Sequence, residues 1–188
     1  MGFEGHAGVL RDEDDGALGG ITQDACCDAV VAEGFEAGGH NGRDETTTMV
    51  LIPAVCAAVN IPVLAAGGIA TGRQMLAAMV LGAEGVQVGS RFIASNEASS
   101  HDNFKTKVIM AKEGDTQLSL KQLTPVRLLK NNFFKQIQDA EKKCASVNEL
   151  QQLLGNGRAK LGMFEGNVEE KTWSKKFKQC PIFQLLAI

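Results

Sequence analysis

The strongest constraint on the fold of this sequence is a series of short apolar runs, each of which leads into glycine-rich sequence. The runs are rich in Val, Leu and Ala and cover residues 29–32, 62–66 and 85–88. Such runs are typical of parallel strands that are buried on both faces. Helix-like segments at 48–59 and 73–81 separate the runs. The sequence therefore predicts βα units and a parallel sheet, an α/β fold.

Two features of these helix-like segments predict how they pack. Pro53 implies either a late start of the first helix near Leu51 or a kink. Four large apolar residues of the second segment recur at helical spacing: Met75, Leu76, Met79 and Val80. This spacing predicts the face of the helix that packs on the sheet.

Residues 101–170 have a more helical pattern than the preceding part of the chain. The candidate helices are 104–111, 126–144 and 147–154. Ser146 followed by Glu149 fits a capping box at the start of the last helix.

Charge and composition exclude several classes of protein. The chain has 188 residues, a formal net charge of −3, 44% hydrophobic and 22% charged residues, as in a globular protein of one domain. The slightly acidic balance argues against nucleic-acid binding. No apolar window is long enough to span a membrane, and the first 20 residues do not resemble a signal peptide, so we expect a cytoplasmic protein. The five cysteines have no paired spacing, which predicts neither disulfides nor a metal site.

The loops that follow the predicted strands form the strongest candidate site. They contain Gly38-Gly39-His40, Gly67-Gly68 and Gly89-Ser90. Because the carboxyl ends of parallel strands meet at one edge of a sheet, we expect these loops to converge. Glycine exposes backbone amides, and the helix that opens near Thr71 adds a positive end. The sequence therefore predicts an anion site, with phosphate as the first candidate.

Two side chains near these loops could take part in chemistry. His40 lies between glycines and titrates near neutral pH, which suits proton transfer, although a loop histidine can also be an exposed residue without a role. Glu33, at the end of a predicted strand, is either a partner of the ligand or an ordinary charged strand terminus. We assign no chemistry to residues 44–48, which fit a solvated loop and helix cap. Motifs of Rossmann dinucleotide sites, P-loop NTPases, zinc proteases and serine hydrolases are absent.

The order of these segments resembles the nitronate monooxygenase family, formerly called 2-nitropropane dioxygenases, and almost equally the related flavin-dependent enoyl-acyl carrier protein reductases. The segments that carry the resemblance are 32–42, 61–69, 81–92, 124–127 and 162–166. The resemblance implies a (β/α)8 TIM barrel that binds FMN. It also implies that the chain acts on a small-molecule substrate.

The resemblance assigns roles to individual residues. It implies that His40 is the catalytic base or proton-handling residue beside the flavin. Glu33 and Gly38 would approach the flavin, and Gly68 would bind its phosphate. The remaining cofactor-binding candidates are the neighbours of these residues in the three loops: Gly39, Gly67, Gln87, Val88, Gly89 and Ser90.

The reaction that the resemblance implies is the FMN-mediated oxidation of an alkyl nitronate by O₂ to a carbonyl compound and nitrite. One alternative is NAD(P)H-dependent reduction of an enoyl thioester. A second is a catalytically silent remnant that binds phosphate or associates with itself. A different phosphate-binding barrel, such as a relative of IMP dehydrogenase, would share the Gly67-Gly68 and Gly89-Ser90 loops but would not explain the segment that ends at His40.

The chain departs from the family pattern at both ends. A complete barrel of this type has around 250 residues, so we expect a C-terminal half barrel followed by a helical region. The expected segments are a poorly ordered or divergent 1–24, barrel βα units with the FMN phosphate site at 25–100, a helical 101–170 and a divergent basic tail at 171–188. Exposed barrel edges would favour a homo-oligomer.

Overall fold

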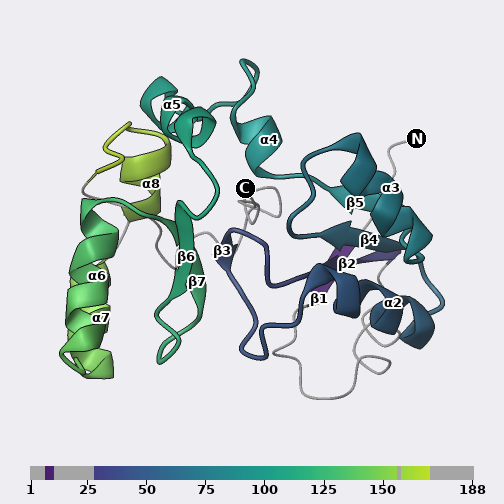
Figure 1. The fold of residues 1–188 in the computed structure, drawn as a ribbon, viewed down its shortest axis with the longest axis horizontal. Coiled ribbons are helices and arrows are strands. Elements are labelled where there is room, and N and C mark those ends of the chain that lie inside the picture. The colour runs from purple at the N-terminus through teal and green to yellow at the C-terminus, as the bar shows by residue number, and fades with distance from the viewer. Residues whose placement is uncertain (1–6, 11–27, 156–157, 170–188) are drawn as a thin grey trace. The chain divides into compact units, whose positions relative to one another are not determined.

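The computed structural model describes residues 7–10, 28–155 and 158–169 and consists of two compact units (Figure 1). The first unit comprises the described residues up to Ala37 together with Asn41–Val88. The second unit comprises Gly38–His40 and the described residues from Gly89 onward. The sequence length favoured one domain, so this division is a difference from the expectation.

The first unit contains a four-stranded parallel sheet in the order β1-β2-β4-β5. The strands are β1 (Ala7–Leu10), β2 (Ala29–Glu33), β4 (Val63–Ala66) and β5 (Gly85–Gln87). The three predicted strands are therefore confirmed as parallel neighbours. Strand β1 was not predicted, and the rest of 1–24 lies outside the described residues, as does the predicted tail at 171–188.

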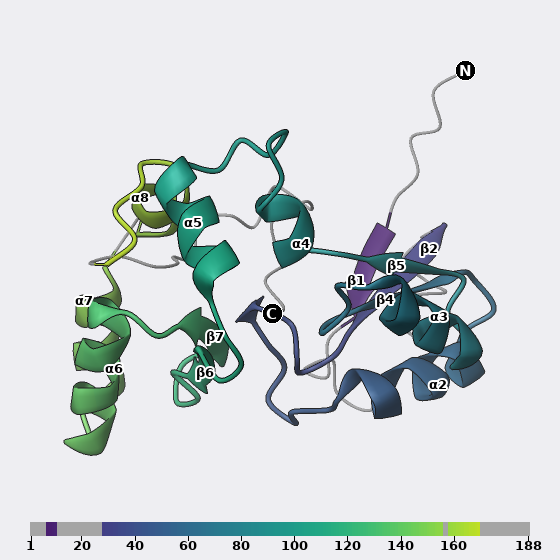
Figure 2. The ribbon, with the colours of Figure 1, turned by 45° about the horizontal axis from the view of Figure 1, so that its top comes forward.

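Two helices, α2 (Thr48–Ala58) and α3 (Gly72–Val80), cover one face of this sheet, as Figure 2 shows. Alternate residues of β2 and β4 point into the core between the sheet and the helices, among them Val30 and Val63. Ile52 and Val55 of α2 are fully buried against them. Each such side chain contributes about 1.5–3 kcal/mol to folding through burial.

Helix α2 begins at Thr48 in spite of the proline five residues later. The expected late start near Leu51 is therefore wrong. Pro53 lies inside the helix on its exposed side, where water can hydrate the carbonyl group that lacks an N–H partner. The early start has a local cause, described below, in a carboxylate that binds the first amide of the helix.

Helix α3 packs on the sheet through a different face from the one that the sequence predicts. The four apolar residues expected there are instead exposed: Met75 by 39%, Leu76 by 62%, Met79 by 40% and Val80 by 80%. Ala78, which is 3% exposed, is the residue of α3 that enters the core. The small alanine lets the helix approach the sheet closely, and the larger residues then lie on the outer side.

The second unit contains a three-stranded antiparallel sheet in the order β3-β7-β6. Its strands are β3 (Gly39–His40), β6 (Thr116–Ser119) and β7 (Val126–Leu129). Its helices are α4 (Ser90–Ile93), α5 (Asp102–Met110), α6 (Asn132–Lys142), α7 (Val147–Leu154) and α8 (Arg158–Met163). The predicted helix at 126–144 is thus wrong in its first part, because 126–129 pair with two other strands.

Asn131 separates β7 from α6. Its Oδ1 accepts a hydrogen bond from the Phe134 N–H at 2.8 Å, which caps α6, and its Nδ2 donates to the Val168 carbonyl at 2.7 Å. Asn131 is 4% exposed, so both bonds are made away from water. The cap explains why the helix begins at this point rather than at Val126.

Of the remaining helices of the second unit, α7 and, within two residues, α5 agree with the sequence, whereas α4 and α8 were not predicted. Helix α7 begins and ends as predicted, and the capping box between Ser146 and Glu149 is present. Helices α6 and α7 contribute Phe133, Phe134 and Leu150 to a core that they share with residues of β7. Across the described residues, no helix is long and apolar enough to cross a membrane.

Candidate functional site

Glu33 and Gln87 lie in one row at the carboxyl edge of the parallel sheet. Both are in register with Ala66, Glu33 on one side and Gln87 on the other. Residues in register on parallel strands have side chains on the same face, so the two polar groups flank Ala66 about 10 Å apart. The Glu33 residue is 6% exposed. Two of the predicted cofactor-binding residues are therefore brought to the same edge.

The Gly67-Gly68 turn follows directly after Ala66 in this row. Gly67 has a φ of +97° and Gly68 a φ of +68°, conformations that side chains rarely adopt. A Cβ atom on Gly67 would lie 2.8 Å from the Gly34 carbonyl oxygen, so the turn also requires glycine for close approach. Consecutive residues of this kind expose backbone N–H groups and form a concave anion-binding surface.

A carboxylate occupies the start of α2, next to this turn. The Glu36 Oε2 atom accepts a hydrogen bond from the Thr48 N–H at 2.8 Å, and it shares the single hydrogen of the Thr48 hydroxyl, 2.8 Å away, with the Gly67 carbonyl oxygen at 2.9 Å. Thr47, the N-cap residue, makes no side-chain bond. Glu36 therefore supplies the negative charge that stabilises a helix N-terminus, and this explains the start of α2 at Thr48. Because the Glu36 carboxylate already occupies the start of α2, an external anion is not expected to bind there.

The start of α3 is also largely satisfied by its own side chains. Gln74 Oε1 accepts from the N–H groups of Ala70 at 2.9 Å and Thr71 at 3.0 Å, and Thr71 Oγ1 accepts from the Gln74 N–H at 3.3 Å. The sequence predicted that this helix start would bind an anion. The amides of the glycine turn are better placed for that role, since Gly68 N–H meets no acceptor among the described residues.

His40 and Gly39 belong to the second unit, where they form β3. Gly39 is in register with Arg127 and His40 with Val126. Residues paired across antiparallel strands share a face of the sheet, so His40 lies on the face that carries Val126. The next residue, Asn41, is 3% exposed and donates from Nδ2 to the Ala37 carbonyl at 2.8 Å. The loop around His40 is thus anchored both by strand pairing and by a buried amide.

The side chain of Ser90 carries a buried hydroxyl that forms no hydrogen bond among the described residues. Ser90 is the first residue of α4 and is 5% exposed. An orphaned buried hydroxyl costs free energy unless it binds something. A phosphate oxygen is one group that would satisfy it.

The predicted site residues are therefore divided between the two units. Those of the first unit lie at one sheet edge or in the residues that follow it: Glu33, Gly67, Gly68, Gln87 and Val88. Those of the second unit are Gly38, Gly39, His40, Gly89 and Ser90. The loop that contains His40 follows β2 of the same sheet, but not directly, because β2 ends at Glu33 and Gly39–His40 pair with β7 of another sheet.

Three residues of this site were missed by the sequence reasoning. The sequence analysis places Thr48 in a solvated loop and helix cap and gives no role to Glu36 or Gln74. The sequence around Thr48 gives little indication of its role, because its hydrogen-bond partners Glu36 and Gly67 are distant in sequence. Gln74 had a local signal, because Thr71 followed by Gln74 has the spacing of a capping box.

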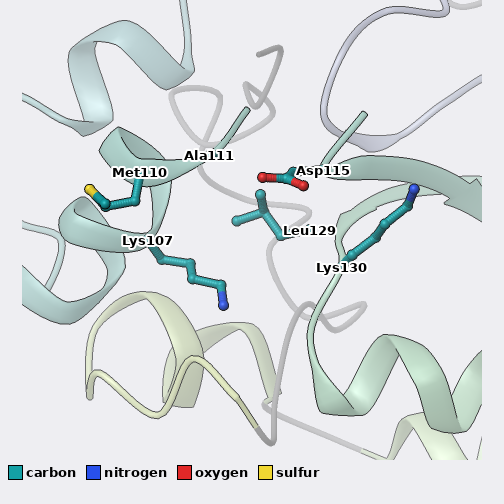
Figure 3. A pocket seen from close by; sticks show the side chains of 6 residues that line it. All are labelled: Lys107, Met110, Ala111, Asp115, Leu129 and Lys130. Carbon is teal, nitrogen blue, oxygen red and sulfur yellow. The ribbon is translucent and has the colours of Figure 1, made fainter. Parts of the chain in front are cut away.

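The second unit has a pocket of about 250 Å³ that contains none of the predicted site residues (Figure 3). Its lining combines α5 with the strand β7 and the turn before β6: Lys107, Met110, Ala111, Asp115, Leu129 and Lys130. Lys107 forms an ion pair with Glu169 at 2.7 Å, and Asp115 accepts from the Lys112 N–H at 2.8 Å. Because these charged groups have structural partners, we assign the pocket no chemistry. No group of three or more His, Cys, Asp or Glu residues suited to a metal occurs in the part of the chain that the structure describes.

A four-stranded parallel sheet covered by helices, with a left-handed glycine turn at its carboxyl edge, places the first unit in the α/β class. Within that class, the chain belongs to the nitronate monooxygenase family, whose sequence profile matches residues 17–176.

Individual relatives agree with this assignment. A Staphylococcus saprophyticus protein named "probable nitronate monooxygenase" is 36% identical over 159 residues, which are 79% of this chain and 44% of the relative. The structure of FabK from Thermotoga maritima has a TM-score of 0.78 and 40% identity, covering 88% of this chain and 51% of FabK. A nitroalkane oxidase from Streptomyces ansochromogenes has a TM-score of 0.58 and 30% identity, covering 69% of this chain and 39% of the oxidase. The chain thus spans about half the length of these relatives or less.

Proposed function

We propose that this chain is the later half of a (β/α)8 barrel that binds FMN and oxidises alkyl nitronates with O₂ to a carbonyl compound and nitrite. Family membership and the similarity to a nitroalkane oxidase support this proposal. The observation that carries it is the arrangement of Glu33, Gln87 and the Gly67-Gly68 turn at one sheet edge.

The residues present fit the phosphate group of FMN. In the first unit, the Gly67-Gly68 turn exposes the Gly68 amide, and both glycines have φ values that disfavour any side chain. In the second unit, the buried Ser90 hydroxyl lacks a partner among the described residues. When bound, FMN would supply the redox chemistry.

The chain's own residues would orient the ligand and manage protons. The Gly68 N–H would donate to a phosphate oxygen. Glu33 and Gln87 would line the sheet edge beside the ligand. His40 would move a proton at one imidazole nitrogen, because imidazole is a side chain that can both accept and return a proton near neutral pH.

Two substitutions separate the proton role from the phosphate role. His40→Ala is expected to abolish turnover of propyl nitronate while FMN stays bound through gel filtration. Gly68→Asp is expected to eject FMN, because a carboxylate and its bulk would fill the phosphate position. Loss of FMN from His40→Ala would contradict the proton assignment, and full FMN content in Gly68→Asp would contradict the phosphate assignment.

A second candidate function is NAD(P)H-dependent reduction of enoyl thioesters. The specific observation in its favour is the better structural match to FabK, with a TM-score of 0.78 against 0.58 for the nitroalkane oxidase. Parallel assays on the same flavin-loaded protein distinguish the two. Oxygen consumption with propyl nitronate supports the monooxygenase, whereas NAD(P)H oxidation that requires crotonyl-CoA supports the reductase. A colourless protein that is inactive in both assays supports the silent remnant, which could associate through the edge strands of its sheet.

A further inference from the structure

Both carbonyl groups of the Gly67-Gly68 turn are held by side chains from the two neighbouring helices. The Gly67 carbonyl oxygen lies 2.9 Å from the hydroxyl of Thr48, the first residue of α2. The Gly68 carbonyl accepts a hydrogen bond of 2.8 Å from Gln74 Nε2, in the first turn of α3. The turn is therefore anchored at two consecutive peptide groups.

Anchoring a carbonyl also orients the amide that follows it. In a trans peptide, the C=O of one residue and the N–H of the next point in opposite directions. With the Gly67 carbonyl directed at Thr48, the Gly68 N–H points away from α2. With the Gly68 carbonyl directed at Gln74, the Ile69 N–H points away from α3. Two successive amides are thus aligned on the side of the turn opposite the helix side chains.

Glu36 and Gly34 restrict the position of Thr48. Its backbone N–H and its hydroxyl both lie 2.8 Å from Glu36 Oε2. A Cβ atom on Gly34 would lie 2.5 Å from the Thr48 nitrogen, so the chain after β2 passes directly against this residue. Packing therefore holds the Thr48 hydroxyl between Glu36 Oε2 and the Gly67 carbonyl oxygen, which share its single hydrogen.

We propose that Thr48 and Gln74 are positioning residues that set the anion-binding geometry of the Gly67-Gly68 turn. They do not touch the anion. They act by fixing the two carbonyls, so that the Gly68 and Ile69 amides are aligned before the anion arrives. The inference rests on the proposed phosphate site and adds the residues that preorganise it.

The first experiment titrates the isotope-labelled chain with inorganic phosphate and follows the amide resonances of Gly68 and Ile69. In the wild type and in Thr48→Ser, which keeps the hydroxyl, we expect saturable shifts of these two amides. In Thr48→Val, which keeps the shape but loses the hydroxyl, we expect phosphate affinity to fall by about tenfold, the value of one hydrogen bond. Equal affinities in the wild type and Thr48→Val would overturn the proposal.

A matched pair tests Gln74 separately from its capping role. Gln74→Leu removes both the α3 cap and the bond to the Gly68 carbonyl, whereas Thr71→Ala weakens the same capping box and leaves that bond. We expect a loss of phosphate affinity in Gln74→Leu alone. Equal losses in both variants would mean that only the helix cap matters and would overturn the assignment of Gln74.

A comparison of the affinities for FMN and for riboflavin, which lacks the phosphate, separates a failure of this inference from a failure of the proposed function. A wild type that binds both flavins equally would contradict the FMN phosphate site, even if inorganic phosphate still shifts Gly68. A wild type that prefers FMN, with the same preference in Thr48→Val, would leave the FMN site intact and overturn the positioning role.

Discussion

Gly34 and Thr48 lie closer together than a side chain on residue 34 would allow. A Cβ atom on Gly34 would be 2.5 Å from the Thr48 nitrogen and 2.6 Å from its Cα. These are backbone atoms of the first residue of α2, so they cannot move aside without moving the helix. The contact joins the end of β2 to the start of α2 beside the glycine turn.

Gly34→Ala is therefore expected to destabilise the protein by about 1–3 kcal/mol, the usual cost of forcing extra atoms into a packed site. Urea denaturation followed by circular dichroism measures this. Gly72→Ala is the control, because a Cβ there would meet nothing within 4 Å, and alanine favours the helix. Similar stabilities of the two variants would contradict the close contact.

Asn131→Ala is expected to cost about 2 kcal/mol of unfolding free energy. The substitution removes the cap of α6 and leaves the buried Val168 carbonyl without its donor. Ser146→Ala, which removes an exposed cap of α7, should cost about 1 kcal/mol. Chemical denaturation of both variants compares the buried cap with the exposed one, and a smaller loss in Asn131→Ala would contradict its role as a link to the segment at Val168.

The Lys107–Glu169 ion pair predicts a small pH dependence of stability. The hydrogen bond from Lys107 holds the pKa of Glu169 below its ordinary value of 4.5. The pair therefore stabilises the folded state above about pH 4.5, and this contribution is lost as the pH falls through the lowered pKa. Both side chains are more than a third exposed, so the screened contribution should stay below about 1 kcal/mol.

Denaturation curves at pH 3 and pH 6 test this relationship. Lys107→Met should reduce the difference in stability between the two pH values. Lys142→Met, on the exposed side of α6, should leave that difference unchanged. An unchanged difference in Lys107→Met would mean that the ion pair contributes nothing.

The outer face of α3 predicts self-association. Leu76 and Val80 are 62% and 80% exposed, and exposed apolar patches mark contact surfaces or aggregation sites. The double variant Leu76→Lys/Val80→Lys should lower the apparent mass in sedimentation velocity at high concentration. Its unfolding free energy should change by no more than about 1 kcal/mol, since both sites are on the surface.

Ala78→Lys is the matched control on the other side of the same helix. Ala78 is 3% exposed, so a charged side chain there should unfold the first unit. If Leu76→Lys/Val80→Lys unfolded the protein as strongly as Ala78→Lys, the outward orientation of these residues would be wrong.

The sequence predicted those parts of the fold that depend on local pattern. The strands around Val31, Leu64 and Val86 were found from apolar runs alone, and α7 was found from its capping box. The errors arose where partners distant in sequence decide the structure. Val126–Leu129 are extended because they pair with β3 and β6, which no local pattern around them reveals.

As with the fold, only those features of the candidate site that depend on local pattern could be predicted from the sequence. The Gly67-Gly68 turn could be expected at a strand end from topology, whereas Gln87 was assigned only through the family resemblance and the role of Glu33 stayed open. The hydrogen bonds of Thr48 to Glu36 and of Gln74 to Gly68 could not be predicted, because they depend on how closely α2 and α3 approach the turn. That approach is set by three-dimensional packing of small residues such as Gly34 and Ala78.

The pairing of β3 with β7 limits how this protein can be divided. Gly38–His40 lie between two stretches of the first unit in sequence but complete the sheet of the second. A single cut of the chain therefore cannot release the second unit whole. A fragment that starts at Gly89 would lack the strand beside Val126, and a fragment that ends at Val88 would carry that strand without its partner. Exchange of one contiguous gene segment could not transfer the complete second unit without also transferring Asn41–Val88 of the first unit.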